Sequence, residues 1–186
     1  GEGWLKEGRK VDLKTVKCDN YTHQTRYDLP IPPSPNLRTM TAIYLYPSIC
    51  YFEATPVSLG RGTDKPFEIY GHPDMKGRSF DFTPRSVAGA KNPPQLDNLC
   101  HGVDLSAADR EAVIAAGIDL GYLIDAYRDL NIGDKFFTSF FEKLIGRGDI
   151  RGMIEQGMSS DEIKATWAGD VEKFKKQRKP YLLYAE

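Results

Sequence analysis

The sequence lacks the patterns that mark several large classes of protein. No apolar run in its 186 residues approaches the roughly 20 residues that a membrane-spanning helix needs. The net charge of −1 gives no electrostatic basis for binding nucleic acid or an anionic membrane. The chain contains no phosphate-binding GxxxxGKS/T loop, no GxSxG nucleophile elbow and no HExxH zinc motif. We therefore expect no membrane span, no nucleic-acid partner and no cofactor.

Cysteine and histidine are also scarce. The cysteines are Cys18, Cys50 and Cys100, and the histidines are His23, His72 and His101. Three cysteines far apart exclude a disulfide framework and a CxxC metal site, so we expect buried free thiols and no metal. Among the scattered histidines, His72 has the best claim to a pocket, because the backbone must turn between Gly71 and Pro73.

The first ten residues, GEGWLKEGRK, have no apolar stretch behind a basic end, which a secretion signal requires. We expect an internal cut of a longer protein here, and the segment therefore says nothing about export.

Size and composition fit a globular domain with a real core. The chain has 186 residues, of which 40% are hydrophobic and 27% charged. We predict a single domain over 1–186 of the α+β class, with a strand-and-loop part over 1–104 and a helical part over 105–186. Since loops on a rigid scaffold present most functional side chains, chemistry is expected on the loops of the first part.

Short strand-like runs alternate with proline-rich loops in the first part. We predict strands over four runs, which are 11–17, 41–47, 67–71 and 78–84. The run 41–47, TAIYLYP, is almost continuously apolar and ends at its proline, as a buried strand does. The segments 29–36 and 90–98 contain several prolines, which lack the amide donor, so we expect stiff, packed loops there.

The second part has the apolar spacing of helices. Three to four packed helices are predicted, over about 106–130, 138–145, 150–156 and 159–179. Ser106 is expected to cap the first, while Gly146 and Gly157 follow the second and third in the position that ends a helix.

The last predicted helix has the clearest signals. Ser159 and Glu162 have the spacing of a capping box. Its expected buried stripe consists of Ile163, Trp167, Val171 and Phe174. Beyond Pro180, the segment YLLY (181–184) is predicted to be a final short strand or a docked tail.

Residues 51–73, YFEATPVSLGRGTDKPFEIYGHP, gather carboxylates, an arginine and aromatic rings. Glycoside hydrolysis generally uses two carboxyl groups, and aromatic rings offer apolar faces to sugars. Glu53 follows the apolar run ICYF, so we expect it at a strand end near the core. Arg61 lies between two glycines that permit positive φ and close approach of a ligand, and its guanidinium suits a carboxylate partner. Alternatively, Arg61 pairs with Glu53 or Glu68 and only holds the loop.

Three stretches, which together extend over most of the chain, resemble a known family. They are PPSPN (32–36), YLYPSICYFEATPVSLGRGTDKPFEIYGHP (44–73) and EIKATWAGDVEKFKKQRKPYLLY (162–184). In this order they resemble the C-terminal half of the exo-β-N-acetylmuramidase family, which was long known as a domain of unknown function and acts in peptidoglycan recycling. The sequence is similar to versions from Bacteroides-type bacteria.

The resemblance implies a hydrolase that removes terminal N-acetylmuramic acid from peptidoglycan fragments by cleaving a β-1,4 bond in the periplasm. It also implies a partner, a Rossmann-like N-terminal domain of the same parent protein, with the active site in the cleft between the two. The chain in hand would be the substrate-recognition domain and would be inactive or poorly active alone.

The resemblance also implies site residues. Glu53 is the expected catalytic acid, base or orienting group, and Arg61 the expected partner of the lactyl carboxylate. The substrate-binding residues that it implies are Ser34, Asn36, Ser58, Arg61, Gly62, Thr63 and Glu68. His72 joins them as a candidate because of the turn between Gly71 and Pro73. The chain departs from the family pattern at Ala54, Pro56 and Leu59, where glycine, asparagine and glutamate are usual.

Two other functions stay open. The chain could be a non-catalytic carbohydrate-binding, cell-wall-binding or interaction module whose GRGT loop is structural, and a buried, closed ion pair at Arg61 would favour that. It could also be a complete small hydrolase that uses Glu53 with Asp64 or Glu68. An open pocket shared by Glu53, Arg61 and Asn36 would favour the muramidase domain.

Overall fold

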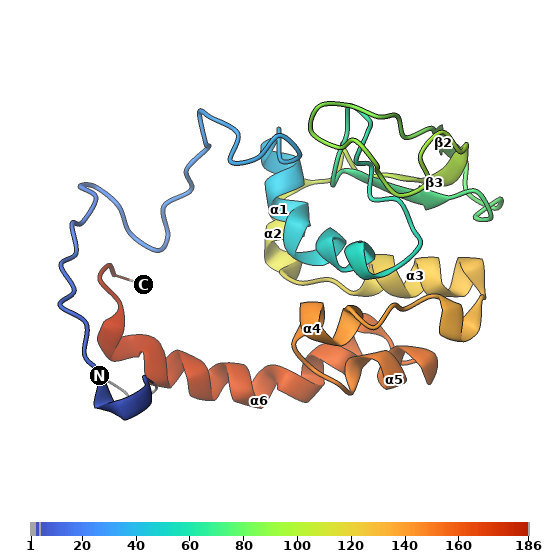
Figure 1. The fold of residues 1–186 in the computed structure, drawn as a ribbon. Helices are drawn as coiled ribbons and strands as arrows, with labels where there is room; N and C mark the ends of the chain where they lie inside the picture. Colours follow the sequence, from blue (N-terminus) through green and yellow to red (C-terminus); the bar gives the residue numbers. More distant parts are fainter. Residues whose placement is uncertain (1–2, 4, 186) are drawn as a thin grey trace. The chain divides into compact units, whose positions relative to one another are not determined.

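A computed structural model describes residue 3 and residues 5–185 of the chain. The chain divides into two compact units, which we call the main unit, Asp28–Asp170, and the terminal unit, Gly1–Tyr27 with Val171–Glu186. The main unit contains the sheet and most of the helices (Figure 1). The α+β class predicted from the sequence is confirmed.

The elements follow one another in a mixed order. The strands are β1 (Ile69–His72), β2 (Phe80–Phe82) and β3 (Cys100–Asp104). The α-helices are α1 (Met40–Ile49), α2 (Arg110–Ala116), α3 (Gly121–Leu130), α4 (Phe141–Ile145), α5 (Ile150–Glu155) and α6 (Ser160–Arg178). Short 3-10 helices are η1 (Lys6–Gly8), η2 (Cys50–Ala54), η3 (Gly133–Lys135) and η4 (Lys179–Tyr181).

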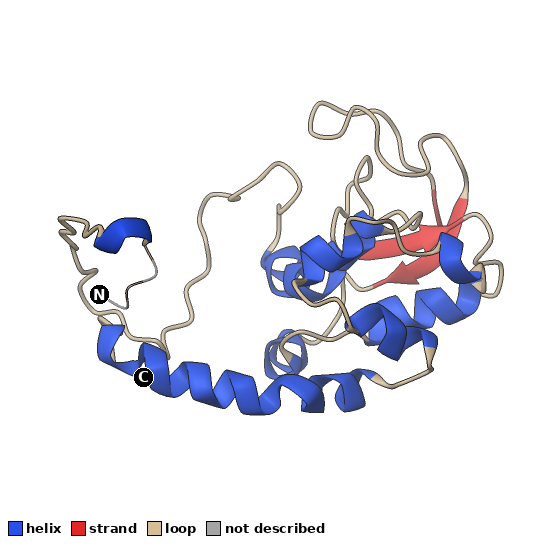
Figure 2. Ribbon diagram, turned by 60° about the horizontal axis from the view of Figure 1, so that its bottom comes forward, coloured by secondary structure: helices blue, strands red, loops and turns tan. Residues whose placement is uncertain are grey.

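The three strands, red in Figure 2, form one antiparallel sheet in the order β1-β3-β2. Gly71 of β1 lies opposite Gly102 of β3. A Cβ added at Gly102 would lie 1.9 Å from the carbonyl oxygen of Tyr70, so only glycine permits this close approach. The strands predicted over 67–71 and 78–84 are confirmed; β1 is shifted and ends one residue later than predicted, and β2 is shorter than predicted.

The strand predicted over 41–47 is wrong, because this segment lies in α1. The Thr39 side chain accepts a hydrogen bond from the Ala42 amide and caps the helix. Ala42, Leu45 and Ile49 then share one buried face at helical spacing. A short apolar run fits a buried strand and a buried helix equally, and Pro47 is accommodated inside the helix.

The strand predicted over 11–17 is also absent. These residues have no regular secondary structure and pair with no strand among the described residues, and their side chains are exposed.

The long helix predicted over about 106–130 is divided into α2 and α3 at Gly117, whose φ is 62°. The cap of α2 is Asp109, whose side chain accepts from the Ala112 amide, so the prediction of Ser106 as cap is wrong. The Ser106 hydroxyl instead accepts from Lys65 Nζ at 2.9 Å. A hydrophobic pattern can continue across a turn, and that explains the error.

The shorter helices match their predictions closely. α4 ends at Gly146 with φ 74°, and α5 is followed by Gly157 with φ 84°. At the start of α6, the Glu162 carboxylate accepts from the Ser159 amide at 2.8 Å, and Ser159 Oγ accepts from the Glu162 amide at 3.3 Å. The predicted capping box is therefore confirmed.

The predicted stripe of α6 is buried only in its first half. Ile163 is fully buried and Trp167 packs against the core, but Val171 and Phe174 are 42% and 54% exposed. The YLLY segment forms no strand; its Tyr184 hydroxyl accepts from the Cys18 amide, and its ring meets Tyr21 edge-on, as the docked-tail alternative predicts.

Aromatic rings fill the core of the main unit. Phe52 stacks on Tyr70 at 4.8 Å, and the Tyr70 ring meets Tyr122 of α3, which runs along one side of the sheet (Figure 1). Cys50 and Cys100 are buried thiols, as predicted, whereas Cys18 is exposed, contrary to prediction.

The described part of the chain contains neither a membrane-spanning helix nor a cluster of metal ligands. None of its helices combines the length and apolar character needed to cross a membrane. Residue 3 and residues 5–185 contain no cluster of three or more histidine, cysteine or acidic side chains placed to hold a metal ion.

Candidate functional site

The candidate site is the loop that joins η2 to β1, residues 55–68. Its backbone is fixed to the sheet at Ser58, whose amide and carbonyl both bond Gly71 of β1, at 2.8 and 2.9 Å. Val57 and Leu59 are fully buried on either side of Ser58. The loop is therefore held rigidly, and the side chains that leave it have defined positions.

Glu53 and Arg61, singled out from the sequence, lie together. Arg61 Nη2 donates to Glu53 Oε1 at 2.5 Å, and the two side chains are 32% and 28% exposed. Glu53 lies in η2 rather than at a strand end, so that part of the prediction is wrong. The pair is neither buried nor fully solvated. It is therefore intermediate between the two outcomes considered from the sequence, a buried, closed ion pair and an open pocket.

The guanidinium of Arg61 has a second support. Its carbon lies 5.1 Å from the centroid of the Phe67 ring, in cation–π geometry. Phe67 is 1% exposed and has φ 63°, a left-handed conformation that is strained for a bulky residue. Its amide donates to the Leu59 carbonyl at 2.8 Å, which closes the loop beneath Arg61.

Tyr46 completes this cluster and was missed from the sequence. Its ring lies 5.1 Å from the Phe67 ring, and it is 40% exposed. Burial raises the pKa of its hydroxyl, Cys50 and Glu53 raise it further, and Arg61 lowers it. Had residues 41–47 been assigned to a helix, the spacing of Tyr46, Cys50 and Glu53 would have indicated a shared face. We call Tyr46, Glu53, Arg61 and Phe67 the arginine cluster.

The two glycines beside Arg61 both have φ 82°, as predicted from the sequence. A Cβ at Gly60 would lie 2.6 Å from the Lys65 carbonyl oxygen, and one at Gly62 would lie 2.4 Å from the Arg85 carbonyl oxygen. The protein itself therefore fills the space beside both glycines. In this structure they permit tight packing of the loop, while contact of Gly62 with substrate stays a prediction.

Three other predicted residues hold the loop together. Ser58 is fully buried, and its hydroxyl accepts from the Gly60 amide at 3.4 Å. The Thr63 hydroxyl donates to the Gly60 carbonyl at 2.7 Å and accepts from the Lys65 amide. Glu68 is 5% exposed and accepts from the Thr39 hydroxyl at 2.7 Å. These four bonds position the loop and the start of α1.

Ser34 and Asn36 lie in a separate proline-rich turn. Asn36 is 8% exposed, and its side-chain amide donates to the Gly89 carbonyl at 3.1 Å. Ser34 Oγ accepts from the Asn36 amide at 3.2 Å. Among the described residues, no hydrogen bond joins this turn to Glu53 or Arg61.

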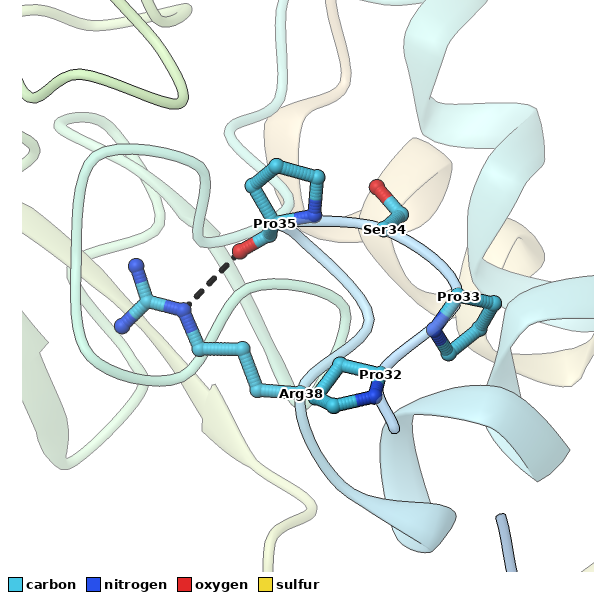
Figure 3. A pocket seen from close by; sticks show the side chains of 5 residues that line it. All are labelled: Pro32, Pro33, Ser34, Pro35 and Arg38. Carbon is cyan, nitrogen blue, oxygen red and sulfur yellow. Dashed lines mark hydrogen bonds between the residues drawn. The ribbon is translucent and has the colours of Figure 1, made fainter. Parts of the chain in front are cut away.

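The turn also lines an open depression of about 480 Å³ (Figure 3). Its lining residues are Pro32, Pro33, Ser34, Pro35 and Arg38. Arg38 Nε donates to the Pro35 carbonyl at 2.9 Å, and within the described part of the chain its two terminal nitrogens have no partner. This depression therefore offers a second guanidinium, which the sequence did not single out.

His72 lies at the end of β1, with His101 of β3 directly opposite and Asp81 of β2 beyond it. The Asp74 amide donates to His72 Nδ1 at 3.1 Å, and burial lowers the pKa of His72 against the opposing effect of Asp74. His101 Nδ1 lies 2.6 Å from Asp81 Oδ1. Among the described residues, no hydrogen bond, ion pair or ring contact joins His72 to the arginine cluster.

Three comparisons identify related proteins. The family model described as "Exo-beta-N-acetylmuramidase NamZ, C-terminal" matches residues 44–184. Peptidoglycan beta-N-acetylmuramidase NamZ of Bacillus subtilis (strain 168) is 35% identical over 191 residues, which cover 94% of this chain and 46% of that protein. A crystal structure of a DUF1343 family protein from Bacteroides fragilis is 63% identical, with a TM-score of 0.97, and the match covers 100% of this chain and 52% of that one. The chain thus spans about half the length of these relatives.

Proposed function

We propose that this chain, which belongs to the exo-β-N-acetylmuramidase NamZ family, is the substrate-recognition domain of a longer hydrolase. The family model that it matches describes the C-terminal part of these proteins. The proposed substrate is a peptidoglycan fragment with N-acetylmuramic acid at its non-reducing end. The observation that carries the proposal is the arginine cluster, in which an acid, a guanidinium and two aromatic rings meet at a partly exposed surface.

Arg61 is suited to bind the lactyl carboxylate that distinguishes muramic acid from other sugars. Glu53 engages only its Nη2, and Phe67 supports the guanidinium face. Among the described residues Arg61 makes no other hydrogen bond, so its remaining N–H groups, including the second one on Nη2, can donate to a second carboxylate without breaking the internal ion pair. The exposed Tyr46 ring adds an apolar face beside that position.

Glu53 is proposed to take part in the reaction from this position. Hydrolysis adds water to the anomeric carbon and returns a proton to the departing glycosidic oxygen. Because it is hydrogen-bonded to a guanidinium, Glu53 is held in a fixed position, and we propose that it orients substrate. The proton donor would then come from the part of the parent protein outside this chain.

An active site shared with that other part explains why the arginine cluster lies at the surface. Binding sites commonly form where two domains meet. We therefore propose that the cluster is one wall of an interdomain cleft and that the chain alone has little or no activity. The proposed location is the periplasm, where fragments of this kind are made, and cell fractionation tests it.

The test measures release of N-acetylmuramic acid from a chromogenic β-muraminide. The longer protein that carries this chain is compared with its Arg61→Ala variant, with the 186-residue chain as a third sample. Losing the bidentate partner of the lactyl group should lower kcat/KM about 100-fold, which corresponds to roughly 3 kcal/mol. The 186-residue chain should show no turnover.

Arg78→Ala is the matched control. Arg78 pairs with Asp129 at 2.6 Å, and these side chains are 33% and 30% exposed, close to the values for Arg61 and Glu53. The control should lose an ion pair of similar exposure and keep its activity. An equal loss of kcat/KM in both variants would mean that the Arg61–Glu53 pair has only a structural role. That outcome would favour the alternative of a non-catalytic carbohydrate-binding module.

A further inference from the structure

We propose that residues 10–17, which we call the extended segment, form a β-strand that is added to the edge of a sheet in the part of the longer protein outside this chain. This inference rests on the proposed function only in taking the chain as one part of a longer protein. It concerns the terminal unit alone and assigns a partner to a segment that has no strand partner among the described residues.

The side chains of the extended segment lack the burial that their chemistry favours. Val11, Leu13 and Val16 are 70%, 75% and 95% exposed. In an extended chain Val11, Leu13 and Thr15 point to one side, while Asp12, Lys14 and Val16 point to the other. This near-alternation, rich in β-branched residues, is that of a strand with one covered face.

The backbone of the extended segment is equally without partners. Among the described residues no hydrogen bond involves its amides or carbonyls, although the bonds on either side of it are present, from Arg9 to Lys6 and from Cys18 to Tyr184. An extended run of open amides and carbonyls with one apolar face is the donor side of β-strand addition. A sheet edge would satisfy the backbone and cover the apolar face together.

The terminal unit holds the end of the segment in place. The Cys18 amide donates to the Tyr184 hydroxyl at 2.8 Å, and Tyr21 meets the Tyr184 ring at 4.9 Å. Farther on, the His23 amide donates to the Ala185 carbonyl at 3.0 Å. The segment therefore leaves an anchored point, which lowers the entropy that pairing would cost.

More apolar surface lies on the same unit. Its exposed large apolar side chains include Val171 (42%), Phe174 (54%), Tyr181 (53%) and Leu183 (43%). Such a concentration of uncovered apolar residues marks an interaction surface. This explains why the predicted stripe of α6 is uncovered at Val171 and Phe174, since their partner lies outside this chain.

The proposed partner of the extended segment is the rest of the same longer protein rather than a second copy of the chain. The chain covers 46% and 52% of the two relatives described above, so a portion of similar size is available to present the sheet. A covalently continuous partner has a high effective concentration and competes well against a separate molecule. The other possible occupant, a second copy, is an outcome of the test below.

Amide hydrogen exchange, resolved by NMR, tests the proposal without reference to activity. In the 186-residue chain the amides of residues 11–17 should exchange close to the rate of an unstructured peptide. In the longer protein the amides that face the sheet edge should exchange at least about 100-fold more slowly, in a period-two pattern. Unprotected amides in both samples would overturn the proposal.

A pair of proline variants in the longer protein gives a second readout. Lys14→Pro and Thr15→Pro change adjacent polar residues whose amides point to opposite sides of a strand. An added edge strand needs only one of the two amides, so one variant should lose the protection of the whole segment and its neighbour should keep it. Equal retention in both variants would contradict strand addition.

The same samples also test whether the extended segment pairs with a second copy of the chain. Protection that appears in the 186-residue chain together with a dimer in analytical ultracentrifugation would assign the segment to self-association and overturn the proposed occupant. The strand proposal and the proposed function can fail separately. If the amides of the longer protein are protected but it releases no N-acetylmuramic acid, the strand proposal is supported and the muramidase function is contradicted.

Discussion

At the scale of single residues, the arginine cluster depends on a strained backbone. Phe67 has φ 63° and is buried, a combination that a bulky side chain seldom adopts. Its ring supports the guanidinium of Arg61 at 5.1 Å and contacts Tyr46 at the same centroid distance. Strain of this kind persists when surrounding structure enforces it, and it gathers at functional sites.

Two substitutions at Phe67 separate this strain from the packing. Both Phe67→Ala and Phe67→Gly remove the ring and should lower the free energy of unfolding, but glycine accepts the positive φ that alanine resists. The glycine variant should therefore be the more stable of the two by about 1 kcal/mol. Urea unfolding of both variants measures the difference, and an alanine variant as stable as the glycine variant would show that the strain is absent.

Residue-level reasoning from the sequence found half of this cluster. Arg61 stood out because it lies between two glycines, and Glu53 because it follows the apolar run ICYF. Tyr46 was missed because its place beside them depends on α1, and Phe67 because its conformation depends on the bond between its amide and Leu59. Positions that depend on tertiary contacts leave no local pattern to read.

At the scale of elements, the loop of residues 55–68 has a conformation fixed by its glycines. Gly62 has φ 82°, and a Cβ there would approach the Arg85 carbonyl oxygen and the Pro93 ring at 2.4 and 2.7 Å. Neither contact can be relieved by turning a flexible side chain. The loop thus forms only with glycine at this position.

Gly62→Ala should consequently destabilise the main unit by about 2 kcal/mol or more. Gly148→Ala is the control, because no atom lies within 4 Å of a Cβ built there. Thermal unfolding of the two variants should show a lower midpoint for the first alone. An unchanged midpoint for Gly62→Ala would mean that the loop adopts another conformation.

Element prediction succeeded where short-range signals decide the structure. The Ser159–Glu162 capping box and the stop at Gly146 are local, and both are confirmed. The run 41–47 contains no capping or stop signal of this kind. Its apolar side chains pack on the core in a helical arrangement, and this packing could not be predicted from the run itself. The extended segment was predicted as a strand, but it pairs with no strand among the described residues, and the partner that we propose lies outside this chain.

At the scale of the whole molecule, the two units contain different thiols. Cys18 lies in the terminal unit and is exposed, whereas Cys50 and Cys100 lie buried in the main unit. Burial raises the pKa of both buried thiols to about 11, with Glu53 adding to the effect at Cys50. Thiolate is the reactive form, so these two groups are protected by burial and by protonation together.

Thiol labelling at pH 8 should therefore distinguish the units. Cys18 is expected to react quickly, while Cys50 and Cys100 react at least about 100-fold more slowly because little thiolate forms at that pH. Raising the pH toward 11 should narrow the gap in the folded protein, and adding urea should close it when the main unit opens. Mass spectrometry after timed labelling assigns each site. Two or three fast thiols in native buffer would show that the main unit opens readily, and its loop would then be too mobile to hold Arg61 and Glu53 in a fixed pair.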